Sequence, residues 1–457
     1  MYRVGSSNSH RGSWRGQASR PRARYTWNRG RDSTPKPEVT TPPYGSLITE
    51  IAVENLNTQI RGAKITDVKY AASYSLVERY SSKILIPGQP ATWKPPQLPT
   101  QLPPDHGDYL RDHNGARFKH PLQPTVQSLF ALNNNFDPSN VDIMGCASSL
   151  GDILRFTISV ESTFRFDVEM IGNTLFITRN HGKELIPDVR GYGHSFLDTF
   201  TSHEGNLKAT ESHQRIVSYS FGGLKCLLRF ECDSYIEDKD TEPETTDIDL
   251  PKTPTSSNPI CPENSGKVVS QASILEIKTR SEARGPLDMS EQLPRLWLRQ
   301  VPTLVTAYHA RGRFADVQQK PVAHDTLTWE SEHEAELQVF AAVLRQLIVE
   351  VKRAGHRKLE LCRTGLGPLE LREQAGALRE ALPAYWKDRW AGEYRQAVSP
   401  DGDDDEGRGK AARGECVHSD GCPSLRESSG SEDEDEIALD YTACDFDTCG
   451  YCGHCGG

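Results

Sequence analysis

One short strand constrains the fold of this chain more than any other feature of the sequence. In the segment SILEIKTR (273–280), Glu276 and Lys278 interrupt a run of aliphatic residues. Residues i and i+2 of a strand point to the same face of a sheet, so this carboxylate and this ammonium group lie side by side. We therefore expect a sheet that is largely buried and carries a charged site on one face.

A second strand, upstream, repeats this spacing. Glu231 and Asp233 are also two positions apart, in the segment LLRFECDSY (227–235). If the two strands are neighbours, three carboxylates and one lysine meet on one sheet face. Such oxygen ligands suit Mg²⁺ or Mn²⁺, and two such ions clamp the attacking and leaving oxygens of a phosphodiester. Lys278 would then orient the attacking water and stabilise the charge that develops on the phosphate.

The Glu-Ile-Lys pattern alone is weak evidence, because it is also common on edge strands. The elements around it support an α/β fold. Segments 164–180 and 222–236 are rich in Phe, Ile, Leu and Val, and the Ile-Gly-Asn turn in the first predicts a hairpin. Apolar residues at helical spacing in 336–352 predict an amphipathic helix whose stripe is core. We expect a mixed β-sheet flanked by helices.

The order of motifs resembles the catalytic half of the DXO family of RNA 5′-end decapping enzymes, which have a PD-(D/E)xK nuclease core. The motifs that carry the resemblance are GGLKCLLRFECDSY (222–235), ILEIKTR (274–280), LPRLWLRQVPTLVTAYHARGRF (293–314) and LELCRTGLGPLELRE (359–373). GCASSLGDILR (145–155) and FRFDVEMIGNTLFITRN (164–180) resemble the N-terminal half of the same family. The resemblance covers about residues 45–390 and implies a PD-(D/E)xK nuclease-like fold.

Transferred residue by residue, the resemblance implies a metal site and a catalytic group. Glu231, Asp233, Glu276 and the carbonyl of Ile277 would bind Mg²⁺ or Mn²⁺, and Lys278 would serve the hydrolytic water. Asp233, Glu276 and Lys278 are thus the expected catalytic residues. The implied activity is metal-dependent hydrolysis at RNA 5′ ends, either decapping or 5′-end pyrophosphohydrolase or nuclease activity. The implied partners are RNA and a 5′–3′ exoribonuclease.

Three positions depart from the family pattern. Where the family has an Arg-Gly pair, this chain reads IMGCASSL, so that Met144 or Gly145 replaces the arginine near the RNA 5′ phosphate. Where the family has Gly-Tyr-Lys-Phe-Glu, the segment GYGHSFLD (191–198) lacks the glutamate or shifts it to Asp198. The family's helix glutamine falls near Arg295. Two alternatives therefore stay open: a relative that binds RNA or protein without catalysis, and a DNA nuclease of the same fold.

The chain also resembles an uncharacterised fungal family with an Arg/Gly-rich start and a CGYCGHC-type end, whose members are often labelled geranylgeranyl pyrophosphate synthase. Prenyl synthases hold Mg²⁺-diphosphate with two Asp-rich patterns of the DDxxD kind on facing helices. That spacing does not occur in this sequence. The nearest acidic run, DGDDDEG (401–407), lies in a segment that we expect to be disordered, so the residues do not support this label.

Charge divides the chain into regions. Residues 1–31 carry eight Arg and no acidic residue, whereas residues 401–457 carry sixteen Asp or Glu against four Lys or Arg. Segments of this kind cannot bury a core and are expected to be disordered. We expect a disordered Arg/Gly-rich arm, a nuclease-like domain with a disordered insertion, an acidic disordered linker and a Cys-rich terminus. Their bounds are 1–44, 45–398 with the insertion at about 237–271, 399–440 and 441–457.

The basic arm is suited to nucleic acid. Its arginines, among them Arg11, Arg15 and Arg29, are interleaved with Tyr and Trp, and such groups contact phosphates and stack on RNA bases. A solvated tail and a mitochondrial transit peptide are the alternatives. We expect a nuclear or cytoplasmic protein, with the mitochondrion as the alternative. The sequence has no run of eighteen apolar residues, so we expect no membrane insertion.

The last residues hold a cluster of cysteines. Cys444, Cys449, Cys452 and Cys455 have the spacing x₄, x₂, x₂, with glycines that permit tight turns. Four thiolates this close can form a tetrahedral Zn²⁺ site. An iron–sulfur cluster and free or redox-active thiols are the alternatives.

Overall fold

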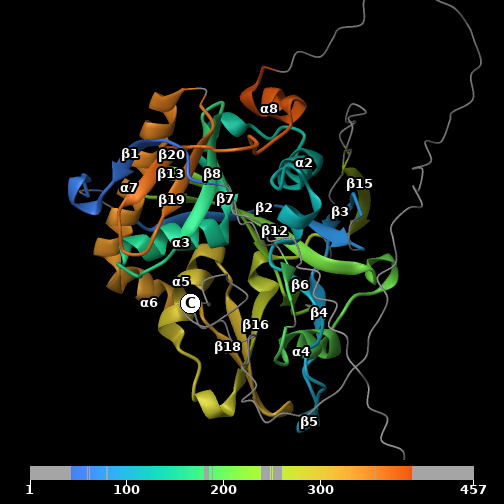
Figure 1. Cartoon of the computed structure of the whole chain (residues 1–457). Helices are drawn as coiled ribbons and strands as arrows, with labels where there is room; N and C mark the ends of the chain where they lie inside the picture. The colour runs from blue at the N-terminus through green and yellow to red at the C-terminus, as the bar shows by residue number, and fades with distance from the viewer. Residues whose placement is uncertain are drawn as a thin grey trace, which may run out of the picture. The chain divides into compact units, whose positions relative to one another are not determined.

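The computed structural model of the chain describes residues 43–393 apart from 59, 61, 79–80, 180–184, 188, 238–247, 249, 251–259 and 356. Within these residues the strands form two large mixed sheets and a two-stranded ribbon, and helices pack on the sheets (Figure 1). The expected α/β fold, with mixed sheet flanked by helices, is confirmed. Residues 1–42 of the terminal arm, the acidic linker and the Cys-rich terminus lie outside the described residues.

The larger sheet has eleven strands in the described part of the chain. In spatial order they are β1 (Leu47–Ile51), β20 (Leu369–Glu373), β19 (Leu359–Arg363), β8 (Phe164–Ile171), β9 (Thr174–Arg179), β7 (Ile143–Cys146), β13 (Leu224–Glu231), β12 (Thr210–Phe221), β2 (Ile65–Val77), β3 (Lys83–Gly88) and β15 (Cys261–Gly266). The pairs β7–β9, β7–β13 and β3–β15 are parallel, and the others are antiparallel. The hairpin expected over 164–180 is β8–β9.

The second sheet has seven strands in the same described residues. They are β11 (Thr201–Ser202), β4 (Ala91–Trp93), β14 (Ser234–Tyr235), β16 (Ile274–Ser281), β17 (Thr303–Ala310), β18 (Arg313–Pro321) and β5 (Thr100–Gln101). The ribbon pairs β6 (Tyr109–Leu110) with β10 (Leu185–Ile186). The helices are α1 (His113–Arg117), α2 (Gln123–Leu132), α3 (Ala147–Thr157), α4 (Gly193–Phe200), α5 (Met289–Arg299), α6 (Ala323–Glu332), α7 (Glu334–Ala354) and α8 (Ala384–Ala391).

Side chains that alternate along the central strands fill two cores on opposite faces of the larger sheet. Ile143 packs in one core with α3, α5 and α7, whereas its neighbour Met144 packs in the other with α2 and α8. Leu228 and Leu227 alternate in the same way on β13. Strands that are buried on both faces tend toward continuous apolar runs, and Cys226, Leu227 and Leu228 form such a run inside β13. Helices α7 and α8 accordingly lie on different sides of β8 in Figure 1.

A two-glycine turn positions β13. Gly222 and Gly223 join β12 to β13 with φ angles of +54° and +78°, as a tight hairpin turn with two left-handed residues requires. A Cβ atom at Gly222 would lie 2.7 Å from the Cβ atom of Ala341 on α7. The turn therefore needs glycine both for its conformation and for the close approach of α7.

The chain passes from one sheet to the other directly after β13. Glu231 ends β13 in the larger sheet, and after two intervening residues Ser234 begins β14 in the second sheet. Strand β14 pairs antiparallel with β16, with Ser234 opposite Leu275. Continuing this register by one position places Asp233 opposite Glu276. The crossing thus brings together the two segments whose acidic residues carry the expected site.

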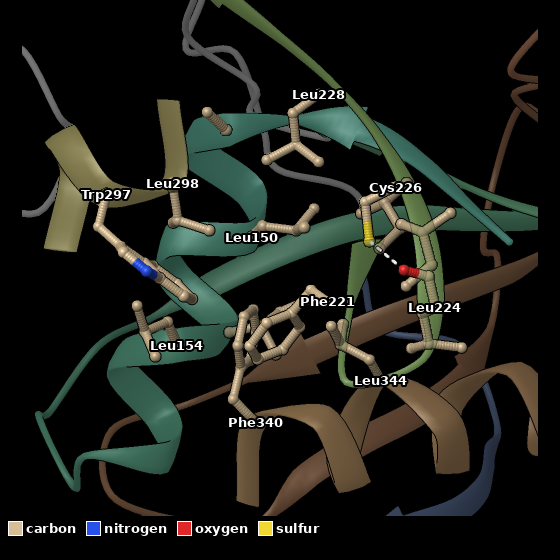
Figure 2. Packing of buried hydrophobic residues seen from close by; sticks show 14 of the residues in the cluster. Leu150, Leu154, Phe221, Leu224, Cys226, Leu228, Trp297, Leu298, Phe340 and Leu344 are labelled. Carbon is tan, nitrogen blue, oxygen red and sulfur yellow. Dashed lines mark hydrogen bonds between the residues drawn. The ribbon is translucent and has the colours of Figure 1, made fainter. Parts of the chain in front are cut away.

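Helix α5 packs against both sheets. Asp288 caps its N-terminus by accepting the Ser290 N–H at 2.9 Å, and Gln300 ends it in the left-handed conformation. Trp297 is buried between α3 and α7, where it lies close to Phe221 and Phe340 (Figure 2). This anchor fixes the rotation of α5, and the arginines one turn apart at 295 and 299 line a cavity next to β16.

The structure differs from expectation at the end of the acidic insertion. The segment 237–271 was expected to be disordered throughout, but residues Cys261–Gly266 form β15, which pairs in parallel with β3. Ile260, directly before β15, is buried. The Pro- and Thr-rich composition of the segment gives no strand signal. The strand forms because it pairs with β3, which is nearly 180 residues away in the sequence. The expected helix at 336–352 is confirmed as α7. In the described residues no helix is long and apolar enough to cross a membrane.

Candidate active site

A cavity of about 680 Å³ lies at the junction of the two sheets. Its lining comes from β6 and α1, from α4, from the start of β12, from the end of β13, from β16 and from α5. The volume is within the range that small-molecule and nucleotide sites occupy. Segments that are far apart in sequence therefore converge on a space large enough for a ligand.

Asp233, Glu276 and Lys278 line this cavity together with Glu231. The Asp233 Oδ2 atom accepts the N–H of Ile277 at 2.8 Å, which holds the carboxylate against β16. The Lys278 Nζ atom lies 2.6 Å from Glu276 Oε1, as the i, i+2 spacing predicts. Glu276 is 3% exposed, whereas Glu231 is exposed at the end of β13. Three of the expected residues thus form a close cluster, with the fourth at its edge.

Arg299 adds a second cation to this cluster. Its Nη1 atom lies 3.0 and 2.9 Å from the two carboxylate oxygens of Glu276. Glu276 is therefore bound by two cationic side chains, Lys278 from its own strand and Arg299 from the end of α5. No sequence pattern indicated Arg299.

The two central carboxyl groups differ in their electrostatic environment. Burial, and next the negative charge of Glu276, raises the pKa of Asp233 to about 7, although Lys278 and the Ile277 N–H oppose the rise. Burial also acts against ionisation of Glu276, but Arg299 and then Lys278 outweigh it and hold the pKa of Glu276 below its usual value. Glu276 is ionised, whereas Asp233 lacks a sufficient positive charge nearby.

The donor types suit a hard divalent cation, but their arrangement does not. Asp233, Glu276 and Glu231 supply the carboxylate oxygens that Mg²⁺ and Mn²⁺ prefer. Within the described residues, however, no three His, Cys, Asp or Glu side chains are grouped closely enough to hold a metal ion. The Arg299 guanidinium lies against both oxygens of Glu276. As the side chains stand, they do not form the expected metal site.

Buried arginine contributes to another wall of the cavity. Arg229, two residues before Glu231 on β13, donates from Nη2 to both oxygens of Asp112 at 3.3 and 3.2 Å. The same nitrogen lies 2.8 Å from the Sγ atom of Cys146. Asp112 also caps α1 by accepting the Asn114 N–H at 2.9 Å. This network fixes α1 and β7 on the wall next to the carboxylate cluster.

Histidines and a tyrosine form the opposite wall. Asp105 accepts the N–H groups of His194 and Ser195 at 3.1 and 2.8 Å, which fixes the start of α4. The His194 ring stacks on Tyr109 with centroids 3.6 Å apart, and burial lowers the pKa of His194 to about 4. Burial also lowers the pKa of His213 well below its usual value. These imidazoles are neutral near pH 7 and act as polar hydrogen-bonding groups.

Several polar atoms on these walls point to a polar occupant. In the described part of the chain, six buried side-chain atoms of the cavity lining have no hydrogen-bond partner in the protein. They are His113 Nδ1, Arg179 Nη2, His203 Nδ1, Thr210 Oγ1, His213 Nε2 and Arg229 Nε. Buried polar groups are normally satisfied, so water or a polar ligand is needed here.

The family positions that depart from the expected pattern have distinct locations. Met144 is buried in the core, and Gly145 packs against β9, so neither replaces a cavity arginine. Asp198 and Arg295 both line the cavity. The expected Zn²⁺ ligands Cys444, Cys449, Cys452 and Cys455 and the expected RNA-binding residues Arg11, Arg15 and Arg29 lie outside the described residues.

Sequence patterns gave no site role to the arginines at 111, 179, 229 and 299 or to the histidines at 113, 194, 203 and 213, which all line the cavity. Half of them, Arg111, His113, His203 and His213, come from segments with no motif. Arg295 and Arg299 could have been found from their i, i+4 spacing on one helix face.

Solved structures of similar fold come from proteins named Rai1. Scheffersomyces stipitis Rai1, in complex with (3'-NADP)+ and calcium ion, is 12% identical, with a TM-score of 0.50 over 77% of this chain and 100% of that chain. S. pombe Rai1 in complex with 3'-FADP is 14% identical, with a TM-score of 0.47 over 71% and 99%. Candida albicans Rai1 in complex with pU5-Mn2+ is 10% identical, with a TM-score of 0.47 over 77% and 100%. The first of these shows that the chain has the fold of Rai1.

No curated protein matches the chain significantly. None of the matches given above is a prenyl synthase, so the label attached to similar fungal sequences has no support. A family model described as a domain of unknown function, DUF8563, matches residues 46–361. This match includes both strands of the carboxylate cluster, the helix α5 and most of the cavity lining, and it spans well over half of the sequence. The chain belongs to the DUF8563 family.

Proposed function

We propose that this protein binds the 5′ end of an RNA in the cavity and hydrolyses a phosphate linkage there. The observation that carries the proposal is the cluster of Asp233, Glu276 and Lys278 at the junction of the two sheets, in a cavity whose walls hold arginines and unsatisfied polar atoms. Arginine guanidinium groups suit phosphate oxygens, since they donate in pairs. The Rai1 fold and the DXO-like order of motifs support the choice of RNA 5′ ends.

The residues of the cluster have separate roles in this proposal. Lys278, held 2.6 Å from Glu276, places a positive charge where the phosphate gains negative charge. Asp233, with a pKa of about 7, is suited to accept a proton from the attacking water near neutral pH. A divalent cation, if held by these carboxylates, would supply Lewis-acid activation of the phosphate. The neighbours crystallised with calcium or manganese ions support such a cofactor.

A second candidate function is binding of a 5′ end without hydrolysis. The specific observation in its favour is the ion pair between Arg299 and Glu276, which takes both carboxylate oxygens. A protein of this kind would retain the cavity and its phosphate contacts but would not hydrolyse the bound RNA. For either candidate we also propose an exoribonuclease partner, on the strength of the DXO-like order of motifs alone. The described residues identify no docking surface for it.

The test compares RNAs that differ only at the 5′ end: methylated cap, unmethylated cap, NAD, triphosphate and monophosphate. Each is incubated with the purified full chain and Mn²⁺ or Mg²⁺, and the products are resolved by chromatography. We expect product from at least one RNA with the wild type, and a loss of at least a hundredfold in Asp233→Asn and Lys278→Gln.

The control is Lys225→Gln, the same substitution at an exposed lysine of the neighbouring strand β13. It should retain wild-type rates. Binding that depends on the 5′ end, with no product from any RNA, would reject hydrolysis and support the second candidate. Neither binding nor product would reject both.

A further inference from the structure

Arg299 is held in place by its backbone while its side chain remains at the cavity. It is the last residue of α5, and its carbonyl and that of Gln300 accept the Nε2 group of Gln271 at 3.3 and 2.9 Å. The side chain of Arg299 is 16% exposed, and that of Glu276 is 4% exposed. The guanidinium is therefore delivered to Glu276 from a fixed point, and only its side-chain torsions need to change for it to leave.

The position of the guanidinium excludes a divalent cation at Glu276. Its Nη1 atom is within 3.0 Å of both carboxylate oxygens, and Lys278 Nζ is 2.6 Å from one of them. One carboxylate thus already carries two positive neighbours. A divalent cation at the same oxygens would meet both steric conflict with Nη1 and repulsion from it, since like charges at this separation repel strongly in a partly buried site.

We infer that Arg299 is a positioning residue that closes the carboxylate cluster against divalent cations, and that a 5′ phosphate opens the cluster by drawing Arg299 away from Glu276. This inference rests on the proposed function, because it assigns an order of binding to the same site. Metal and phosphorylated RNA then bind cooperatively, and neither binds well without the other.

The helix supplies a receiving site for the phosphate. Arg295 and Arg299 are one turn apart on α5 and both line the cavity. Two guanidinium groups at i and i+4 are close enough to bind one phosphate group jointly. When Arg299 turns toward a phosphate beside Arg295, Glu276 keeps Lys278 and gains room for a cation next to Asp233. Arg299 and the cation thereby stop competing for the oxygens of Glu276.

The experiment measures Mn²⁺ affinity directly, from the electron paramagnetic resonance signal of free Mn²⁺, with the full chain and no turnover readout. Wild type, Arg299→Gln and Arg299→Lys are compared. Arg353→Gln is the matched control, because Arg353 is exposed on α7, pairs with Glu350, and makes the same charge change outside the cavity lining. Each protein is titrated alone, with the 5′-phosphorylated dinucleotide pApA and with unphosphorylated ApA.

We expect Arg299→Gln to bind Mn²⁺ at least tenfold more tightly than the wild type without nucleotide. Arg299→Lys, which keeps the charge, and Arg353→Gln should stay within threefold of the wild type. In the wild type, pApA should raise Mn²⁺ affinity at least tenfold and ApA should not, whereas in Arg299→Gln the gain from pApA should disappear. Reciprocity requires Mn²⁺ to raise the affinity for pApA by the same factor.

Equal, weaker or undetectable Mn²⁺ binding by Arg299→Gln, in protein whose melting temperature is unchanged, would overturn the inference. The outcome is separate from that of the proposed function. Tight Mn²⁺ binding by Arg299→Gln without hydrolysis of any RNA would uphold the inference and reject the hydrolase. If the wild type hydrolyses RNA but binds Mn²⁺ as tightly as Arg299→Gln does, the hydrolase is supported and the inference about Arg299 is rejected.

Discussion

Asp233 should destabilise the folded protein in the absence of metal, and Asp233→Asn should therefore stabilise it. The pKa of this carboxyl rises from about 3.9 in an unfolded chain to about 7 in the fold, so its ionisation opposes folding. This destabilisation begins as the pH rises above the pKa of the unfolded chain, grows up to pH 7 and is constant above pH 7. Asparagine cannot ionise and retains an oxygen to accept the Ile277 N–H.

The gain in folding free energy expected for Asp233→Asn follows from the size of the pKa shift of Asp233. At 1.36 kcal/mol per pKa unit, the limit is about 1.5 kcal/mol at pH 5 and about 4 kcal/mol at pH 8. Because the cavity admits water, which screens the charge, we expect roughly half of each value. The assay is urea unfolding of wild type and Asp233→Asn at both pH values, with a chelator present.

The control is Asp388→Asn, at an exposed position of α8, which should change the free energy of unfolding by less than about 0.5 kcal/mol. The reasoning would be refuted by an Asp233→Asn protein that is less stable than the wild type at pH 8. A gain of equal size at pH 5 and pH 8 would refute it as well, since the effect must follow the ionisation of the carboxyl.

Three further predictions concern the frame of the site, and each is measured by urea unfolding. His213→Gln should remove about 1.4 kcal/mol of the stability that the wild type loses between pH 7.5 and 5.5, because the unfolded histidine takes up a proton that the buried one does not; an unchanged pH dependence would contradict this. Arg215→Leu should cost about 3 kcal/mol, since the Arg215 guanidinium donates at 2.7 Å to both the Gln271 side chain and the Val269 carbonyl before β16; a loss below 1 kcal/mol would show that these bonds contribute little. Gly222→Ala should cost about 1–3 kcal/mol through its positive φ and its contact with α7, and a neutral result would mean that the turn and helix adjust freely.

The carboxylate–lysine cluster could be predicted from sequence because it depends on local spacing. Glu276 and Lys278 are on one strand, where a period of two fixes their relation. Their neighbour Asp233 could be predicted as well, since the two apolar strands are close in sequence apart from the acidic insertion. The helix over 336–352 was predictable for the same reason, because its seven apolar residues lie on one common face only if the segment is helical.

The rest of the site depends on contacts that no local pattern encodes. The two acidic strands were expected to share one sheet, but the chain changes sheets between Glu231 and Ser234. The pairing of Arg299 with Glu276 requires the rotation of α5, which is set by the burial of Trp297 in a core made from many other segments of both sheets. The wall residues from α1 and α4 are placed by the capping carboxylates Asp112 and Asp105.

The change of sheet at Cys232 gives the three acidic residues unequal freedom. Asp233 directly precedes β14 and accepts the Ile277 N–H of β16 at 2.8 Å, so the β14–β16 ladder and this bond hold it beside Glu276. Glu231 ends a strand of the larger sheet, and Cys232 separates it from Asp233. A small rotation of one sheet against the other would move Glu231 toward or away from the pair while leaving the pair intact. The third carboxylate is therefore the adjustable member, and the angle between the sheets governs how many oxygens face the cavity at once.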